Sequence, residues 1–173
     1  DQSSALATLA PAISRAERLL LFTKIIMAKP IEYGIEKLAA NQACYLAQEL
    51  ANLIDTVHNQ GLSFDRLTDL VPEEYAVHWQ ETLKFLQIIT EYWPQILAER
   101  QLIDASDRRN RLLRAQIDLW RQNPPVKRIV AAGTTAAFPL MKELVKTVLS
   151  LEKGELYLAG IDKFLEDEAC LLY

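Results

Sequence analysis

Two short apolar runs in the C-terminal part of the chain each end in a glycine followed by polar side chains. Gly133-Thr134-Thr135 follows "RIVAA", and Gly160-Ile161-Asp162 follows "LYLA". Ligands of parallel α/β sheets bind at the carboxyl ends of the strands, so Thr134, Thr135 and Asp162 are the strand-end candidates for a ligand site. A phosphate-binding P-loop would need a glycine-rich turn ending in Gly-Lys-Ser/Thr. The stretch "AAGTTAAF" has one glycine and no lysine and does not meet that need.

The other half of such a site is a hydrophobic strand that ends in acidic, magnesium-binding residues. In "RIVAAG" alanine and glycine stand at those places, so we expect no ATP hydrolysis, no metal site and no cofactor in this segment. Asp162 is more simply a turn cap. His58 and His78 have no partner at metal-ligand spacing, and Cys44 and Cys170 lie far apart without a CxxC motif. Both cysteines are therefore expected to be buried thiols in a reducing compartment.

Arginines recur along one side of a predicted helix over residues 104–123, with only Asp118 among them. These residues are Arg108, Arg111, Arg114 and Arg121. Guanidinium groups match phosphate geometry, so this arginine face could follow a nucleic-acid backbone without reading bases. Residues 100–128 carry a net charge of +5, against −9 for the rest of the chain. The alternative is a solvated face or a docking surface for an acidic neighbour.

Helical periodicity predicts the elements of the N-terminal part. A capping box at Ser14 and Glu17 begins a helix that Pro30 ends near residue 29. A second helix is predicted over 35–59, ended by Gly61, with Leu38, Leu46, Leu50, Leu53 and Val57 on its apolar side. Ser63 can cap a short helix. A long helix over 73–99 follows, which Pro94 should bend near Thr90 because proline lacks a backbone donor. Asp104 is the expected N-cap of the arginine-bearing helix.

The period changes after Pro124 and Pro125. "RIVAAG" is a continuous apolar run, typical of a strand covered on both faces. An amphipathic helix follows, with Leu140, Leu144, Val148 and Leu151 on its inner side; Gly154 should end it, and "ELYLAGID" is a second strand. Strand, helix and strand at these lengths predict parallel neighbours. The expected fold is mainly α with a small parallel βαβ unit, divided into a lead-in segment (1–12), a helical lobe (13–125) and the βαβ part (126–173).

Composition supports a folded domain that does not enter a membrane. Half of the 173 residues are hydrophobic and 24% are charged, which suits a sizeable core. The net charge is −4, so the whole chain is not an evident nucleic-acid binder. The longest apolar run, "LLLFTKIIM", contains a lysine and is much shorter than a membrane span of about 20 residues. A cytoplasmic location is expected. The first residue is not methionine, and we expect the chain to be a piece of a longer protein.

Several blocks of the sequence resemble one known family. "EEYAVHWQ", "DASDRRNRLLRA", "IVAAGTTAAFPLMKELV" and "GELYLAGID" resemble, in order and spacing, the N-terminal half of the AddB family of bacterial double-strand-break repair proteins. The resemblance runs from about Ile13 to Asp162. In that family AddB is the partner of the AddA helicase–nuclease, in a complex equivalent to RecBCD. The resemblance implies a fragment of a degenerate P-loop domain, RecA-like and similar to superfamily 1 helicases.

The same resemblance implies that the helical lobe corresponds to the helicase insertion called subdomain 1B. The βαβ unit would return into the RecA-like core, with "RIVAAG" in place of the magnesium-binding strand but without its Asp-Glu pair. The implied function is a non-catalytic segment in DNA-end processing that contacts DNA or docks against AddA. Two other readings remain open. One is a stand-alone helical protein-interaction module without DNA contact, and the other is a small enzyme using Thr134, Thr135 and Asp162.

Overall fold

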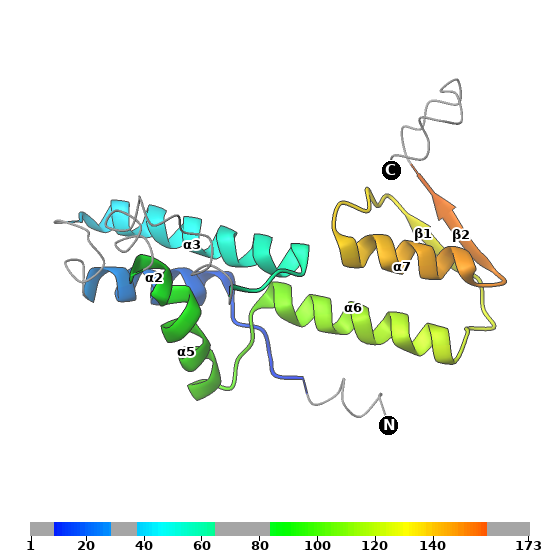
Figure 1. Cartoon of the computed structure of the whole chain (residues 1–173). Coiled ribbons are helices and arrows are strands. Elements are labelled where there is room, and N and C mark those ends of the chain that lie inside the picture. The colour runs from blue at the N-terminus through cyan, green and yellow to red at the C-terminus, as the bar shows by residue number, and fades with distance from the viewer. Residues whose placement is uncertain (1–8, 29–37, 65–83, 159–173) are drawn as a thin grey trace, which may run out of the picture. The chain divides into compact units, whose positions relative to one another are not determined.

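The structure is a computed structural model that describes residues 9–28, 38–64 and 84–158 (Figure 1). The chain is mainly helical with a small two-stranded parallel sheet, as the sequence predicts. It forms two compact units that divide after Arg109, inside helix α6 (Ala105–Gln122). Their described parts are called here the N-terminal unit (residues 9–109) and the C-terminal unit (residues 110–158). The predicted division at residue 125 marks the change from α6 to the first strand.

The first helix of the N-terminal unit is α2 (Arg15–Ala28). The backbone N–H of Glu17 donates to Ser14 Oγ at 3.2 Å, which confirms the predicted Ser14 cap. The Glu17 carboxylate instead accepts a hydrogen bond from Arg100 at 2.9 Å. Phe22 and Ile26 are fully buried and direct one side of α2 into the core.

Helix α3 (Ala40–Gln60) lies beside α2 and ends as predicted at Gly61. Gly61 has φ +66°, a left-handed conformation that glycine adopts at little cost. The predicted start near residue 35 is wrong, because α3 begins at Ala40: Ala39 is extended, and the Gln42 side chain accepts from the Ala39 N–H at 3.0 Å.

The buried side of α3 also differs from the predicted stripe. Its members are Ala43, Ala47, Leu50, Ala51 and Ile54. Of the five residues predicted to be apolar and inward-facing, Leu50 is the one that is buried, whereas Leu53 is 37% exposed. Three alanines on this side let the backbone of α3 approach its neighbour closely. The buried side of α3 is therefore formed largely by alanines, which the leucine pattern in the sequence does not indicate.

The predicted bend near Thr90 takes the form of a π-helical turn, η3 (Ile88–Tyr92), between an α-helical turn at 84–87 and α5 (Trp93–Glu99). Pro94 has no backbone N–H to donate to the Thr90 carbonyl. The Trp93 N–H donates to the Ile88 carbonyl, five residues earlier, which is the π-helical hydrogen bond. The indole of Trp93 is buried against Phe22, with ring centroids 4.2 Å apart. Residues 73–83 of the predicted helix, and most of the short helix after Ser63, lie outside the described residues.

An isolated parallel bridge between Ala12 and Ile103 holds the lead-in segment to the start of α6. Ile13 N–H donates to the Ile103 carbonyl at 2.9 Å, and Ile103 N–H donates to the Pro11 carbonyl at 3.1 Å. The Asp104 carbonyl accepts from the Arg108 N–H at 2.8 Å, which places Asp104 at the predicted N-cap position, immediately before α6.

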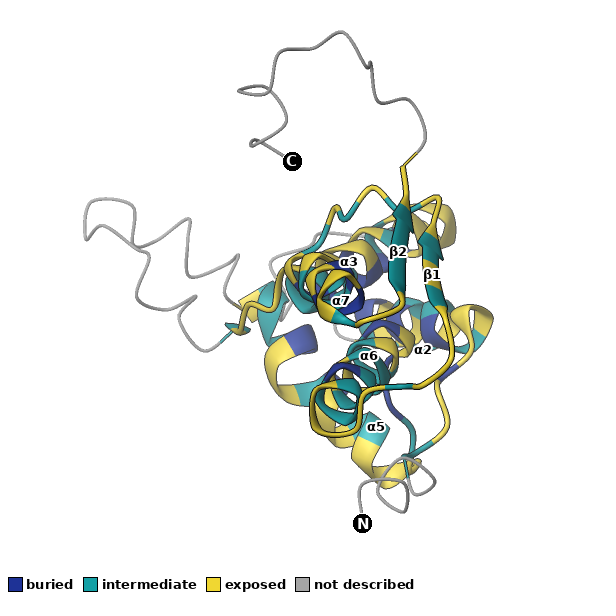
Figure 2. Cartoon of the chain, turned by 90° about the vertical axis from the view of Figure 1, so that its right-hand side faces the viewer, coloured by how far each residue is buried: buried dark blue, intermediate teal, exposed yellow. Residues whose placement is uncertain are grey.

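The C-terminal unit contains the predicted parallel pair, β1 (Ile129–Ala132) and β2 (Gly154–Tyr157), joined by α7 (Pro139–Ser150). Ile129 is in register with Gly154, and Ala132 with Tyr157. α7 packs against both strands. The expectation of a strand covered on both faces is wrong for the described residues, because burial alternates along β1 and Val130 is 48% exposed. In Figure 2 neither strand has the colour of buried residues.

Gly154 has a different role from the predicted one. α7 ends at Ser150, and Gly154 is the first residue of β2. A Cβ atom on Gly154 would lie 1.7 Å from the Val148 carbonyl oxygen, so only glycine fits here. The inner side of α7 is partly as predicted: Leu140 and Val148 are buried, and Val145 and Thr147 join them.

Candidate nucleic-acid interface

The first strand-end candidate forms a closed turn. Gly133 follows β1 with φ +69°, and Thr134 Oγ1 accepts a hydrogen bond from the Ala136 N–H at 3.1 Å. Thr135 is exposed. Asp162 lies outside the described residues, so the predicted meeting of the two strand ends stays a prediction. Within the described ranges, no group of three or more His, Cys, Asp or Glu side chains is placed to hold a metal ion.

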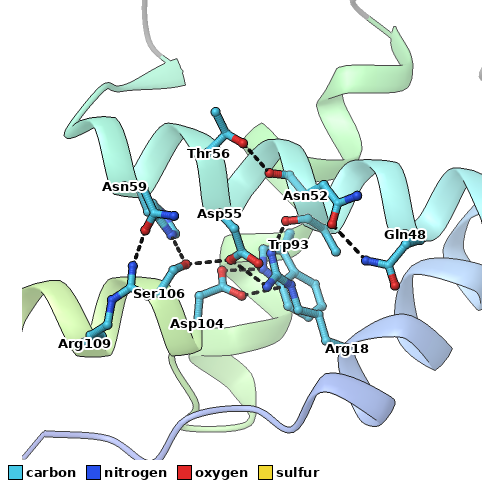
Figure 3. Close-up of polar contacts among 12 residues, drawn as sticks. Arg18, Gln48, Asn52, Asp55, Thr56, Asn59, Trp93, Asp104, Ser106 and Arg109 are labelled. Carbon is cyan, nitrogen blue, oxygen red and sulfur yellow. Dashed lines mark hydrogen bonds and ion pairs between the residues drawn. The ribbon is translucent and has the colours of Figure 1, made fainter. Parts of the chain in front are cut away.

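A cluster of polar side chains lies in the N-terminal unit and joins α2, α3, α5 and the start of α6 (Figure 3). Its centre is Arg18, whose side chain is 7% exposed. Arg18 donates to Asp55 Oδ1 and to the Ala51 carbonyl, both at 2.9 Å. Its Nε atom also lies 3.2 Å from Asp104 Oδ1 as an ion pair, although the N–H is not aligned on that oxygen.

Asp104 is the acidic partner inside this cluster. Its side chain is 4% exposed, and its Oδ2 atom accepts from Trp93 Nε1 at 2.8 Å. Burial raises the pKa of the Asp104 carboxyl above its ordinary value, while Arg18 and the Trp93 hydrogen bond oppose that rise. Desolvation is therefore the larger effect, and the guanidinium compensates for it only in part.

Asp55, His58 and Ser106 meet at the edge of the cluster and share the residue types of a hydrolase triad. Ser106 Oγ donates to Asp55 Oδ1 at 2.7 Å and lies 2.9 Å from His58 Nδ1. A hydroxyl has a single hydrogen, so His58 Nδ1 must carry the proton in the second contact. A nucleophilic serine needs the opposite arrangement, in which the imidazole accepts the hydroxyl proton. Ser106 is also buried, so these three residues support the fold and do not form a nucleophile.

This cluster was not predicted from the sequence, because its members come from helices that are far apart along the chain. One signal was available: Arg18 lies on the same side of α2 as the buried Phe22, at i and i+4. An arginine at a core position predicts a buried acidic partner. Which aspartate it meets depends on how the helices pack, and α2 alone does not contain that information.

The structure places the four predicted arginines in different surroundings. Arg108 is half-buried and donates to the Ala10 carbonyl at 3.2 Å, so it holds the lead-in segment. Arg111 and Arg114 are exposed. Arg121 forms an exposed ion pair with Glu143 of α7 at 2.9 Å. Ile117, at i+3 from Arg114 and i−4 from Arg121 on α6, is buried. The exposed members of the arginine face are thus Arg111, Arg114 and Arg121.

Arg128, another cation of the C-terminal unit, forms hydrogen bonds with side chains of the neighbouring strand. Arg128 donates to the Glu155 carboxylate and to the Tyr157 hydroxyl on the exposed face of the sheet. The Tyr157 hydroxyl also donates to Glu155 Oε2 at 2.9 Å. The hydrogen bond from Arg128, followed by that from Tyr157, lowers the pKa of Glu155 below its ordinary value. Arg128 therefore already has partners for its guanidinium within its own strand pair.

The stretch of residues 110–158 differs in charge from the chain as a whole. Residues 110–158 contain eight basic and four acidic residues, a net charge of +4, whereas the whole chain carries −4. A positive unit within a negative chain can bind a polyanion locally without making the molecule generally basic. Lys142 and Lys146 of α7, which the sequence reading did not single out, are both exposed.

Two further expectations concern the cysteines and the membrane. Cys44 is exposed on α3 and not buried as predicted, and Cys170 lies outside the described residues. Among the helices that the structure describes, none combines the length and apolar character needed to cross a bilayer.

Comparison of the chain with family models, curated proteins and solved structures gave no match.

Proposed function

We propose that this chain is a non-catalytic, helicase-like segment of an AddB-type subunit, and that it contacts the DNA backbone in a complex that processes double-strand-break ends for recombinational repair. The support comes from the order of the sequence blocks "EEYAVHWQ", "DASDRRNRLLRA" and "IVAAGTTAAFPLMKELV". A mainly helical part followed by a parallel βαβ unit agrees with a helical insertion that returns into a RecA-like core. The proposed partner subunit is an AddA-type helicase–nuclease, and the proposed location is cytoplasmic.

The observation that carries the DNA contact is the positive charge of the C-terminal unit together with the solvent-directed arginines of α6. Arg111 and Arg114 are exposed, and Arg121 forms a surface ion pair, which contributes about 0–1 kcal/mol. Arginine forks bind phosphate oxygens in bidentate geometry. Contacts of this kind position a protein on nucleic acid without reading its sequence.

Absence of catalysis in this segment is part of the proposal. A magnesium-dependent helicase strand needs carboxylates where this chain has Ala131, Ala132 and Gly133. Thr134, the nearest hydroxyl, accepts a hydrogen bond from the backbone of its own turn. A strand with small, uncharged residues at its end keeps its packing with α7 but has no group that could position the metal.

A titration with labelled single-stranded and duplex DNA, followed by fluorescence anisotropy, tests this function. Changing Arg111, Arg114 and Arg121 together to alanine should weaken binding roughly tenfold or more at low salt, because phosphate contacts dominate affinity. Arg108 is left unchanged because it supports the lead-in segment. The matched control changes three exposed cations of the N-terminal unit, Arg15, Lys24 and Arg100, which should leave binding within about twofold. Equal losses in both triple variants would refute the arginine face.

The alternative is a protein-interaction module without DNA contact. The specific observation in its favour is a set of large apolar side chains exposed on the N-terminal unit. Leu20 is 62% exposed, Tyr45 67% and Leu62 65%. No measurable DNA affinity, together with co-purification with an AddA-type subunit that is lost on changing these three residues to serine, would favour this alternative.

A further inference from the structure

We infer that the nucleic-acid surface does not stop at α6 but continues onto α7, where Lys142 and Lys146 bind the same phosphodiester backbone and Glu143 weakens that binding by holding Arg121. This inference rests on the proposed function and deepens it. The sequence pattern that suggested a nucleic-acid contact singled out only α6. The extension to α7 comes from one ion pair and from the distribution of charge within the C-terminal unit.

The Arg121–Glu143 ion pair joins the two helices. Arg121 Nη1 lies 2.9 Å from Glu143 Oε1, and the two side chains are 51% and 43% exposed. Arg121 belongs to the arginine face of α6, two turns after Arg114. Glu143 is the direct neighbour of Lys142 on α7. The solvent-directed arginines and the first lysine of α7 therefore lie on adjoining surface of one compact unit.

The two lysines form a stripe on the outer side of α7. Positions i and i+4 lie one above the other on a helix, so Lys142 and Lys146 share one side, opposite the buried Val148. Both are exposed, and among the described residues neither ammonium group has a hydrogen-bond or ion-pair partner. Like charges at this spacing destabilise a helix slightly. The fold gains nothing evident from the pair, whereas a polyanion would neutralise both charges.

Glu143 of α7 pairs with the arginine face of α6, and its position gives it a specific effect. An exposed ion pair in water is weak, so a phosphate can replace the carboxylate as the partner of Arg121. The cost of that exchange, and the repulsion between Glu143 and the incoming phosphate, both reduce affinity. Removing the Glu143 charge should therefore strengthen binding. A surface that carried no phosphate would show no such gain.

The partner is assigned as nucleic acid because the cations form a surface over two helices and do not converge on a point. Arg114, Arg121, Lys142 and Lys146 would each take one phosphate along a backbone. Each cation that contacts a phosphate releases about 0.9 counterion from duplex DNA and adds that amount to the salt slope of the binding constant. An acidic protein would give a smaller and less regular salt response. The salt slope is therefore the measurement that identifies the ligand.

The test uses the whole chain, mixed-sequence duplex DNA and two variants of α7. Lys142→Gln with Lys146→Gln should reduce the salt slope by about 2, because each phosphate-contacting lysine contributes about one. Glu143→Gln should increase affinity about two- to fivefold at low salt. Glutamine keeps helix propensity, and circular dichroism verifies the fold of each variant.

Two controls of matched chemistry come from the N-terminal unit. Glu17 forms an ion pair with Arg100 at 2.9 Å, with side chains 41% and 47% exposed, nearly the same geometry as Glu143–Arg121. Glu17→Gln changes the net charge equally and should leave affinity almost unchanged. Arg15→Gln with Lys24→Gln removes two exposed cations elsewhere and should leave the salt slope within about 0.5 of the parent value.

The outcomes separate this inference from the function on which it rests. If Arg114→Ala weakens DNA binding while the lysine pair and Glu143→Gln have no more effect than their controls, the surface stops at α6 and the inference is wrong, although the DNA contact stands. If the parent chain does not bind DNA at all, both fail. If an acidic polypeptide such as polyglutamate binds as tightly as DNA with the same dependence on α7, the ligand assignment is wrong.

Discussion

Arg18 is the residue whose surroundings explain most about the N-terminal unit. Its buried guanidinium lies between Asp55 and Asp104 and links α2 to α3 and to the start of α6. Burying charge is costly, and a buried pair stabilises a fold only when its members also satisfy each other's hydrogen bonds. Here the Ala51 carbonyl and the Trp93 indole supply hydrogen bonds, whereas Arg18 Nε and Asp104 Oδ1 have no hydrogen-bond partner among the described residues. We therefore expect the cluster to be sensitive to removal of any one member.

Arg18→Met should lower the free energy of unfolding by about 3–5 kcal/mol, because it leaves Asp104 buried without its cation. Urea denaturation followed by circular dichroism measures the change. Adding Asp104→Asn to Arg18→Met should recover part of the loss, since the uncompensated carboxylate is then gone. Arg100→Ala, which breaks an exposed ion pair, serves as the control and should cost about 1 kcal/mol or less. Similar losses in both single variants would contradict a buried cluster.

The pKa of Asp104 gives a second prediction at this scale. Burial raises it above the value of about 3.9 for an unfolded aspartate, so the folded chain holds this proton more tightly than the unfolded chain. The contribution of Asp104 to stability is therefore largest below the unfolded pKa and is lost as the pH rises through the folded pKa. A carbon-13 NMR titration of the aspartate carboxyl groups, assigned with Asp104→Asn, measures this pKa. A value below about 3.9 would show that Arg18 outweighs desolvation.

The helices and strands depend on local signals that the sequence shows and on packing that it does not. Ser14, Gly61, Asp104 and the double proline mark ends of elements correctly, because a cap acts within one turn of the chain. The start of α3 and its alanine-rich buried side were not predicted, since the choice of a buried side depends on the neighbouring helix. The burial of β1 on one face only depends likewise on what covers the sheet.

Gly154 allows a test of packing at the junction of α7 and β2. Gly154→Ala should lower the free energy of unfolding of the C-terminal unit by about 3 kcal/mol or more, because the new Cβ would meet the Val148 carbonyl. Gly133→Ala is the control: it has a positive φ but open space around the missing Cβ, and should cost about 1–2 kcal/mol. Denaturation of both variants gives the comparison. If Gly133→Ala is the more harmful change, the close approach at Gly154 is not rigid.

The whole molecule is a negative chain that contains one positive stretch, residues 110–158. Composition alone gives a net charge of −4 and argues against nucleic-acid binding, while the charge of +4 on residues 110–158 favours it locally. The sequence reading found the arginine part of this surface because four arginines share one helical side. It missed Lys142 and Lys146, because their relation to Arg121 depends on the contact between α6 and α7. Arg108 was included by spacing, although its contact with Ala10 gives it a supporting role.

Nucleotide binding is the property that separates the proposal from a small enzyme at the strand ends. A ligand that binds only the folded state raises the melting temperature, by an amount that grows with its concentration above the dissociation constant. Because "AAGTTAAF" lacks a phosphate-binding lysine, millimolar ATP with magnesium should leave the melting temperature of the chain unchanged. A thermal shift that disappears in Thr134→Ala or Asp162→Asn would contradict the non-catalytic assignment.

The most direct test of the DNA contact is the salt dependence of duplex binding by the unmodified chain. With about four phosphates neutralised, a plot of log affinity against log salt concentration should have a slope between about −3 and −4, the same for DNA of different sequences. A slope near zero, or an affinity that changes with base sequence but not with salt, would contradict the account.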